Sequence, residues 1–175
     1  MRLMRRVRSG QADLALLTLP VDDPAITSVP VLREELMLVM PANHPLAAKD
    51  SVGVEALVGQ PFIVFEQGSN TRRTLDDFFV REQIKPRIVT ESENVEIIKS
   101  MVAAGLGVAI VPFQSVERET RGGSLKVARI RAQQLVRETG WVYRAGERVP
   151  RIVQEMMATP TRIAPQLQIN VDKAS

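Results

Sequence analysis

Four short polar segments follow apolar runs of the chain, and they carry most of the side chains suited to binding a small molecule. Ser, Thr and Asn offer neutral hydrogen-bond donors, and Glu offers acceptors for a cationic group. If the preceding runs are parallel strands, these segments meet at one edge of a sheet, where open sheets bind ligands. The segments are Thr18 after Leu17, Glu66 to Thr71 after Phe65, Glu91 to Asn94 after Thr90, and Phe113 to Ser115 after Pro112.

Two of these segments also open predicted helices. Backbone N–H groups at a helix start have no partner within the helix and carry partial positive charge, so they suit a carboxylate or a similar anion. Ser69, Asn70 and Ser92 can equally serve only to cap their own helices. Glu66, Glu91 and Glu93 can pair with an amine on the ligand or simply face solvent.

Covalent and metal chemistry have little support in the available side chains. The chain has no cysteine and a single histidine, His44, in a predicted turn. Thiolate chemistry and multi-histidine metal sites are therefore excluded. The adjacent acidic pairs Asp22–Asp23 and Asp76–Asp77 do not converge on one helix face. We predict no catalytic residue, no metal site and no cofactor.

Apolar periodicity predicts the elements that position these segments. Apolar runs over 62–65, 86–90 and 108–111 predict buried strands, and helical spacing over about 70–83 and 93–104 predicts a helix between each pair. Strand, helix, strand, helix, strand at this spacing indicates two βαβ units with parallel strands. The fold class is therefore α/β.

The flanking regions are predicted in less regular pieces. The opening residues form the end of a helix, which Gly10 caps in the left-handed conformation. The nearly continuous apolar run Asp13–Leu17 predicts a buried parallel strand. Further elements are an extended stretch over 29–32, strands over 35–40, 125–130 and 139–144, and helices over 113–119 and 149–157.

Length, composition and charge describe an ordinary folded chain. It has 175 residues, 45% of them hydrophobic, which is enough to bury a core without disulfides. The net charge is +3 and the positive charges are spread along the chain, so we expect no phosphate-binding arm. The longest apolar run, Val102 to Phe113, is too short to span a bilayer. The opening residues lack the apolar stretch of a signal peptide, so we expect a cytoplasmic location and no membrane partner.

Four motifs in this order resemble the effector-binding (substrate-binding) domain of LysR-type transcriptional regulators, and the likeness extends to about residue 160. The motifs are G-x-x-D-L-A-L at Gly10–Leu16, the strand Leu36–Pro41 followed by His44-Pro45-Leu46, the helix Ser69–Phe79 with the strand Pro86–Glu91, and V-A-A-G-L-G-V-A-I-V-P at Val102–Pro112.

The resemblance implies a fold like that of type 2 periplasmic binding proteins, with two α/β subdomains joined by two crossing strands. Subdomain I would hold residues 1–38 and 142–160, subdomain II residues 42–138, and residues 161–175 would form a C-terminal tail. The crossing strands would be Glu35–Pro41 and Thr139–Arg144.

A small-molecule effector would then bind between the subdomains and shift the population of cleft geometries. Together with the sheet-edge argument, the resemblance gives these candidate effector-binding residues: Thr18, Glu66, Ser69, Asn70, Thr71, Ser92, Glu93, Asn94 and Phe113.

The resemblance also carries expectations about partners. The family's winged helix-turn-helix is absent from this chain, so DNA would be contacted only through that domain in a full-length regulator, which would be a homodimer or tetramer. The first strand of the effector domain is not found either. We therefore expect subdomain I to be incomplete, with an exposed strand edge beside Leu14–Leu17, in a piece of a longer regulator.

Two alternatives remain open. A free type 2 solute-binding protein would have the same fold, and a secretion signal would favour it. An enzyme on this scaffold, such as a deaminase or dehydratase, would need an acid–base or nucleophile set, which the sequence does not offer. Our primary hypothesis is an effector-sensing domain and not an enzyme.

Overall fold

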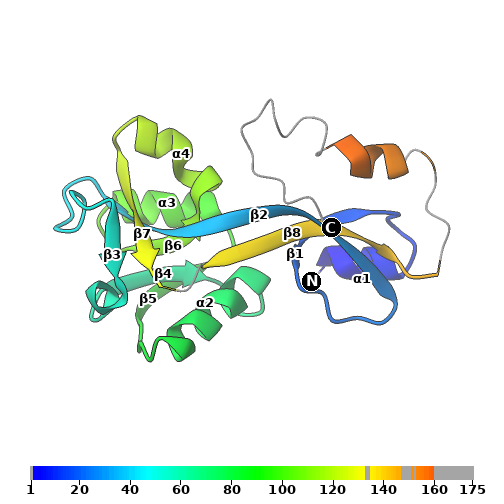
Figure 1. Cartoon of the computed structure of the whole chain (residues 1–175), viewed down its shortest axis with the longest axis horizontal. Coiled ribbons are helices and arrows are strands. Elements are labelled where there is room, and N and C mark those ends of the chain that lie inside the picture. The colour runs from blue at the N-terminus through cyan, green and yellow to red at the C-terminus, as the bar shows by residue number, and fades with distance from the viewer. Residues whose placement is uncertain (1, 133–134, 147–150, 152, 160–175) are drawn as a thin grey trace. The chain divides into compact units, whose positions relative to one another are not determined.

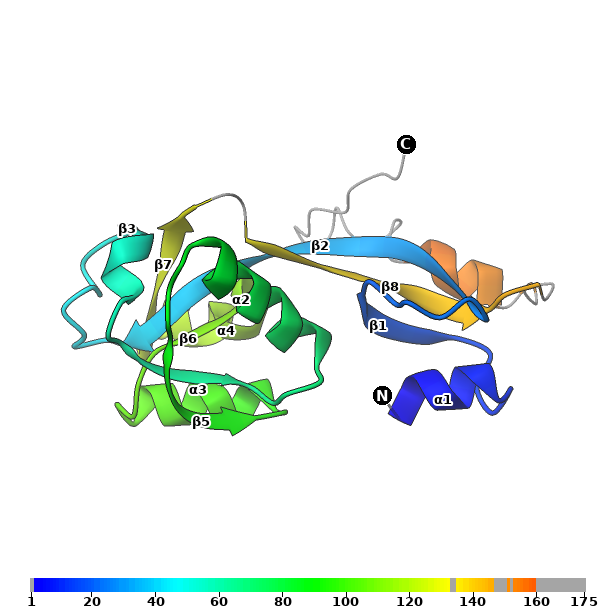
Figure 2. The same cartoon turned by 90° about the horizontal axis from the view of Figure 1, so that it is seen from below.

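The computed structural model describes residues 2–132, 135–146, 151 and 153–159. The chain divides into two compact units, residues 1–34 with 137–175 (unit 1) and residues 35–136 (unit 2). Strand β2 (Ile26–Pro41) belongs to both units, and β8 (Val136–Arg144) begins at the last residue of unit 2. The two strands are hydrogen-bonded neighbours and run side by side in Figures 1 and 2. The predicted α/β fold with two crossing strands is therefore confirmed.

Unit 1 is a small assembly around the first part of β2 and all of β8 except its first residue. It contains α1 (Arg2–Arg8), β1 (Ala15–Leu19), the first part of β2, β8, and a helix over residues 153–159. Strand β1 pairs antiparallel with β8, and α1 lies beside β1 (Figure 2). The buried apolar residues of unit 1 that pack together include Val7, Leu19 and Val142. Gly10 has φ 73° and ends α1 as predicted.

Strand β1 differs from its prediction in position and partner. It begins at Ala15, two residues later than expected, and its partner β8 is antiparallel. A continuous apolar run is typical of a strand buried on both faces, but only Ala15 and Leu19 are buried here, and Leu16 is 49% exposed. The two separately predicted extended stretches, 29–32 and 35–40, merge into the 16-residue β2.

The outer edge of β1 predicts self-association. In the part of the chain that the structure describes, β1 stands at the end of its sheet order, with half-exposed Leu16 beside that edge. An apolar edge strand is a template for pairing with another chain, and a lysine there blunts it. We expect Leu16→Lys to lower the associated fraction of concentrated protein in sedimentation velocity. Val80→Lys, on an exposed helix position, is the control; a wild type that stays monomeric would contradict the prediction.

Unit 2 contains the predicted βαβ pair and the larger core. Strands β4 and β5 pair in parallel, and a parallel bridge between Phe62 and Val108 joins β4 to β6. Strands β6 and β7 both pair antiparallel with β2, and β3 pairs in parallel with β7. The alternation of parallel strands and helices predicted for the middle of the chain is confirmed. The elements are β3 (Ser51–Gly53), η1 (Val54–Leu57), β4 (Pro61–Phe65), α2 (Asn70–Arg81), β5 (Arg87–Ser92), α3 (Val95–Ala103), β6 (Ala109–Pro112), α4 (Phe113–Arg121) and β7 (Leu125–Arg131).

Amphipathic helices cover the strands of unit 2. In α2, Leu75, Phe78 and Phe79 are buried at helical spacing, and the ring of Phe79 meets that of Phe62 on β4 edge to face at 5.3 Å. In α3, Ile98 and Val102 are buried in the same way. This packing fixes where each helix begins relative to the strand before it.

Gly107 allows β4 and β6 to approach closely. The Val108 N–H donates to the Pro61 carbonyl at 2.8 Å, and the Ile63 N–H donates to the Val108 carbonyl at 2.8 Å. A Cβ atom at Gly107 would collide with the Pro61 carbonyl oxygen. Glycine is therefore required by backbone proximity rather than by φ.

Parts of two predictions lie outside the described residues. The helix predicted over 149–157 is seen over 153–159, while 149, 150 and 152 are not described, and neither is the predicted tail 161–175. Among the described helices, none has the length and hydropathy needed to cross a bilayer.

Candidate functional site

Two loops of unit 2 lie side by side at the carboxyl ends of β4 and β5. Phe65, the last residue of β4, stands opposite Ser92, the last residue of β5, in the parallel ladder. The next N–H along, that of Glu66, donates to the Ser92 carbonyl at 3.1 Å. The loop that leads into α2 therefore adjoins the loop that leads into α3. This arrangement brings together seven of the predicted site residues: Glu66, Ser69, Asn70, Thr71, Ser92, Glu93 and Asn94.

The first loop ends in a capped helix start. Ser69 is the N-cap of α2, and its Oγ accepts from the Arg72 N–H at 3.1 Å. Gly68 before it has φ 86°, a conformation that favours glycine. Asn70 and Thr71 open the helix; Asn70 is half-buried and Thr71 is buried. The site therefore presents amide and hydroxyl groups at the positive end of a helix dipole.

The second loop differs from its prediction in the capping residue. Asn94, not Ser92, caps α3, because its Oδ1 accepts from the Glu96 N–H at 2.9 Å. Ser92 ends β5 two residues earlier, and its Oγ accepts from the Asn94 N–H at 3.2 Å. Two successive side chain–backbone turns thus order this loop. Glu93 between them is exposed.

The other two predicted residues lie in different places. Phe113 is the half-buried first residue of α4, directly after β6. Because β6 runs parallel to β4, α4 begins at the same edge of unit 2 as α2. Thr18 lies in β1 of unit 1, opposite Thr139 of β8. Residues opposite each other in an antiparallel pair share a face.

Arg72 is a buried residue at this edge that the sequence analysis missed. Its guanidinium donates from Nη1 to the Phe65 carbonyl and to Glu91 Oε1, both at 2.9 Å, and from Nε to Asp76 Oδ1 at 2.8 Å. Burial opposes the charge, but the hydrogen bonds and charges of Asp76 and Glu91 outweigh it and raise the pKa of Arg72. The spacing of Arg72 and Asp76, four apart on a helix, was the available signal.

Glu34 is a second buried residue without a sequence signal. It lies on β2 in unit 1, where its Oε2 accepts from Arg137 Nε at 2.8 Å and from Thr139 Oγ1 at 3.3 Å. The next residue, Glu35, points to the opposite face of the strand and pairs with Arg129 on β7 within unit 2. The sequence alone does not show which of the two adjacent glutamates is buried or which arginine each one pairs with.

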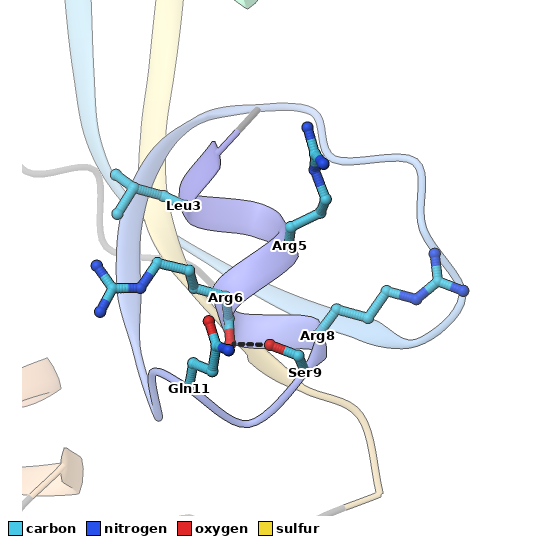
Figure 3. A pocket seen from close by; sticks show the side chains of 6 residues that line it. All are labelled: Leu3, Arg5, Arg6, Arg8, Ser9 and Gln11. Carbon is cyan, nitrogen blue, oxygen red and sulfur yellow. Dashed lines mark hydrogen bonds between the residues drawn. The ribbon is translucent and has the colours of Figure 1, made fainter.

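A hollow along α1 does not form a binding site. Figure 3 shows its lining side chains, three of them arginines, pointing in different directions rather than toward a common point. The hydrogen bond drawn there joins Ser9 Oγ to the Arg6 carbonyl at 3.2 Å. The prediction that positive charges are spread along the chain is wrong for α1, because Arg5, Arg6 and Arg8 lie together in this one short helix.

The chemistry of the adjoining loops is recognition by hydrogen bonds. His44 is part of its turn, because its Nδ1 accepts from the Leu46 N–H at 3.2 Å. Within residues 2–132, 135–146, 151 and 153–159, no group of three His, Cys, Asp or Glu side chains is placed to hold a metal ion. The helix starts, hydroxyls, amide and glutamates of the loops can hold a small polar molecule without reacting with it.

Known proteins resemble this chain in sequence and in fold. A regulator of Bacillus subtilis, the HTH-type transcriptional regulator YybE, is 36% identical over 110 residues, which cover 63% of this chain and 38% of that protein. The regulatory domain of CcmR from Synechocystis PCC6803, solved in complex with 2-PG, has a TM-score of 0.83 at 24% identity and covers 93% of this chain and 78% of that one. The reduced OxyR regulatory domain from Pseudomonas aeruginosa has a TM-score of 0.76 at 29% identity and covers 93% and 79%.

The matches cover most of this chain but only part of each curated relative. The chain spans about half or less of the length of the curated relatives it matches. The family model described as "LysR substrate binding domain" matches residues 1–160, which is most of the chain. The chain therefore belongs to the LysR substrate-binding domain family.

Proposed function

We propose that this chain is the effector-sensing part of a DNA-binding transcriptional regulator, and that it binds a small molecule at the adjoining loops of unit 2. The observation that carries the proposal is the hydrogen bond between the Glu66 N–H and the Ser92 carbonyl, which joins two loops rich in donors at one sheet edge. Thr18 of unit 1 stays a candidate contact, and Phe113 would add an apolar wall. The 2-PG complex of the CcmR regulatory domain supports a small-molecule ligand.

The proposal assigns the remaining functions to the longer protein. DNA would be contacted by a helix-turn-helix domain, as the description of YybE suggests, and the regulator would work as a homodimer or tetramer in the cytoplasm. The effector would act by binding one conformation of the chain more tightly than another, which shifts the population toward it. The relatives are regulators rather than enzymes, and we propose no catalytic step.

A thiol-based switch is excluded for this chain. The OxyR neighbour was solved in a reduced form, which raises the question of redox sensing. This chain contains no cysteine, so neither thiolate nor disulfide chemistry is available to it. Reversible, non-covalent binding is therefore the mode we propose.

Metabolite retention tests the proposed function. The purified chain is dialysed against a bacterial metabolite extract, separated from free small molecules, and analysed by mass spectrometry after denaturation. We expect at least one small molecule to be retained by the wild type and reduced in the Thr71→Ala variant. A wild type that retains nothing above a control protein would contradict the proposal.

Two hydroxyl deletions should weaken binding of that molecule without unfolding the chain. Thr71→Ala and Ser92→Ala each remove one neutral hydroxyl beside the adjoining loops. One neutral hydrogen bond contributes about 0.5–1.5 kcal/mol, so we expect each dissociation constant to rise about 2- to 12-fold in calorimetry. Thr120→Ala is the matched control, because its Oγ1 bonds only within α4, to the Val116 carbonyl at 2.9 Å. Unchanged affinity would remove Thr71 and Ser92 from the site.

A further inference from the structure

Both ends of the loop between β4 and α2 are held by one residue, Arg72. At the start of the loop its Nη1 donates to the carbonyl of Phe65, the last residue of β4. At the end of the loop its backbone N–H donates to the Oγ of Ser69, the N-cap of α2. The residues between these two anchors, 66–68, are exposed and have little apolar packing of their own. Their conformation therefore depends on these two anchors and on the hydrogen bond from the Glu66 N–H to the Ser92 carbonyl.

We propose that Arg72 is a positioning residue that sets the geometry of loop 66–71, and through it the hydrogen-bond donors offered to an effector. This inference rests on the proposed function, because it concerns the same site. The Arg72 guanidinium acts through the Phe65 carbonyl, Glu91 and Asp76, whereas the backbone contact to Ser69 remains with any residue at this position.

The electrostatics of the site explain why Arg72 positions the loop instead of binding an anion. Two carboxylates, Asp76 and Glu91, already accept from the guanidinium, and its side chain is only 7% exposed. A ligand carboxylate that displaced either of them would first have to break a charge-assisted hydrogen bond at a guanidinium that is itself buried. The cationic contribution to an anionic ligand would instead come from the helix start of α2.

The contacts also explain why lysine cannot replace Arg72. The guanidinium is a planar fork whose Nε and Nη1 point to different partners, on α2 and on the two strands. A lysine ammonium keeps the charge but is a single point on a flexible stem, so it cannot hold Asp76 and the Phe65 carbonyl in this geometry together. Charge alone is therefore insufficient, and the geometry of the fork is what the loop requires.

Site-resolved hydrogen exchange of the whole chain, followed by NMR without any ligand, tests this inference. In Arg72→Lys we expect the amides of Glu66 and Ser69, which donate to the Ser92 and Glu66 carbonyls, to exchange about tenfold faster. The amide of Ile63, in the middle of β4, and that of Val108, which bonds to the first residue of β4, should change by less than about twofold. A merely structural role would instead raise exchange throughout unit 2.

A matched control and a second variant make the test decisive. Arg129→Lys removes the same fork geometry from an exposed pair with Glu35, whose two hydrogen bonds are 2.6 and 3.0 Å, and should leave the loop amides unchanged. If Arg72→Lys does not fold, Asp76→Asn weakens the Nε contact alone and should speed loop exchange about threefold. Equal exchange in wild type and variants, or a uniform rise, would overturn the inference.

The two proposals fail in different ways. Hydrogen exchange is measured without ligand, so local loosening of loop 66–71 supports the role of Arg72 whatever the metabolite experiment shows. Retention of a metabolite by the wild type supports the proposed function even if Arg72→Lys leaves the loop unchanged.

Discussion

Replacing Lys99 with methionine is expected to destabilise the chain by about 3 kcal/mol, because the change leaves a partly buried carboxylate without its cation. Lys99 Nζ lies 2.8 Å from the Ser115 carbonyl, from Glu119 Oε1 and from Glu96 Oε1, and its side chain is 9% exposed. It therefore ties α3 to α4. In the described part of the chain, Glu119 Oε2 is buried without a hydrogen-bond partner, so Glu119 depends on Lys99. Urea unfolding at neutral pH measures the loss.

A double variant separates lost charge from lost packing. Lys99→Met with Glu119→Leu removes both members of the pair and leaves no buried charge. We expect its stability to lie within about 1 kcal/mol of the wild type, since apolar replacement of a whole buried pair is often neutral. A double variant as unstable as Lys99→Met would show that packing, not the unpaired carboxylate, is the cause.

The same pair predicts a pH dependence with a definite sign. The hydrogen bond from Lys99 outweighs burial and lowers the pKa of Glu119 below its ordinary 4.5. This contribution to stability is therefore present above pH 4.5 and is lost as the pH falls through the lower, folded-state pKa. Burial opposes the charge on Lys99, but its bonds to Glu119 and Glu96 prevail and raise its pKa above 10.5. That contribution is present below pH 10.5 and is lost as the pH rises through the folded-state pKa. The slope of stability against pH below 4.5 should be shallower in Lys99→Met.

Replacing Gly107 with alanine is expected to cost about 3 kcal/mol, because the added methyl collides with backbone rather than with a movable side chain. The obstructing atom is the Pro61 carbonyl oxygen, which also accepts the Val108 N–H. Relief of the collision must move β6 away from β4. The parallel bridge between Phe62 and Val108 would then weaken, and with it the seating of α2 and α3.

Gly122→Ala is the matched control for Gly107→Ala. Gly122 follows α4 with φ −74°, and the nearest atom to an added Cβ is the Arg118 carbonyl oxygen at an ordinary 3.4 Å. We expect a change within about 0.5 kcal/mol in urea unfolding. If Gly107→Ala is as stable as Gly122→Ala, the close approach of β4 and β6 is not a constraint on the sequence.

The fold of unit 2 could be predicted because its signals are local. A buried parallel strand needs only a short apolar run, and α2 and α3 each bury a stripe at helical spacing. The partner of β1 could not be predicted in this way. The run Asp13–Leu17 fits a strand of either direction, and the residues that decide it, Glu138 to Val142, lie more than a hundred positions later in the chain.

The location of the candidate site could also be predicted, but some of its residues could not. The sheet-edge argument located both loops, since it depends only on where strands end. It did not identify which side chain caps α3, because Ser92 and Asn94 are both suitable cap residues and the helix start differs by two positions. The role of Arg72 could not be predicted for a different reason. Its partner Glu91 is nineteen residues away, and only the packing of α2 against β4 and β5 brings them together.

Unit 1 is built from two segments that are far apart in the sequence, and this has a consequence during translation. Leu19 of β1 pairs with Glu138 of β8, so the first strand emerges from the ribosome long before its partner has been synthesised. At about 5–20 residues per second, the delay is roughly 6–24 seconds. Unit 2, which is one continuous segment, is complete by then. During this interval the nascent chain carries β1, with its apolar residue Leu16, without the partner strand β8. We therefore expect chaperone binding to β1 to be strongest in this interval.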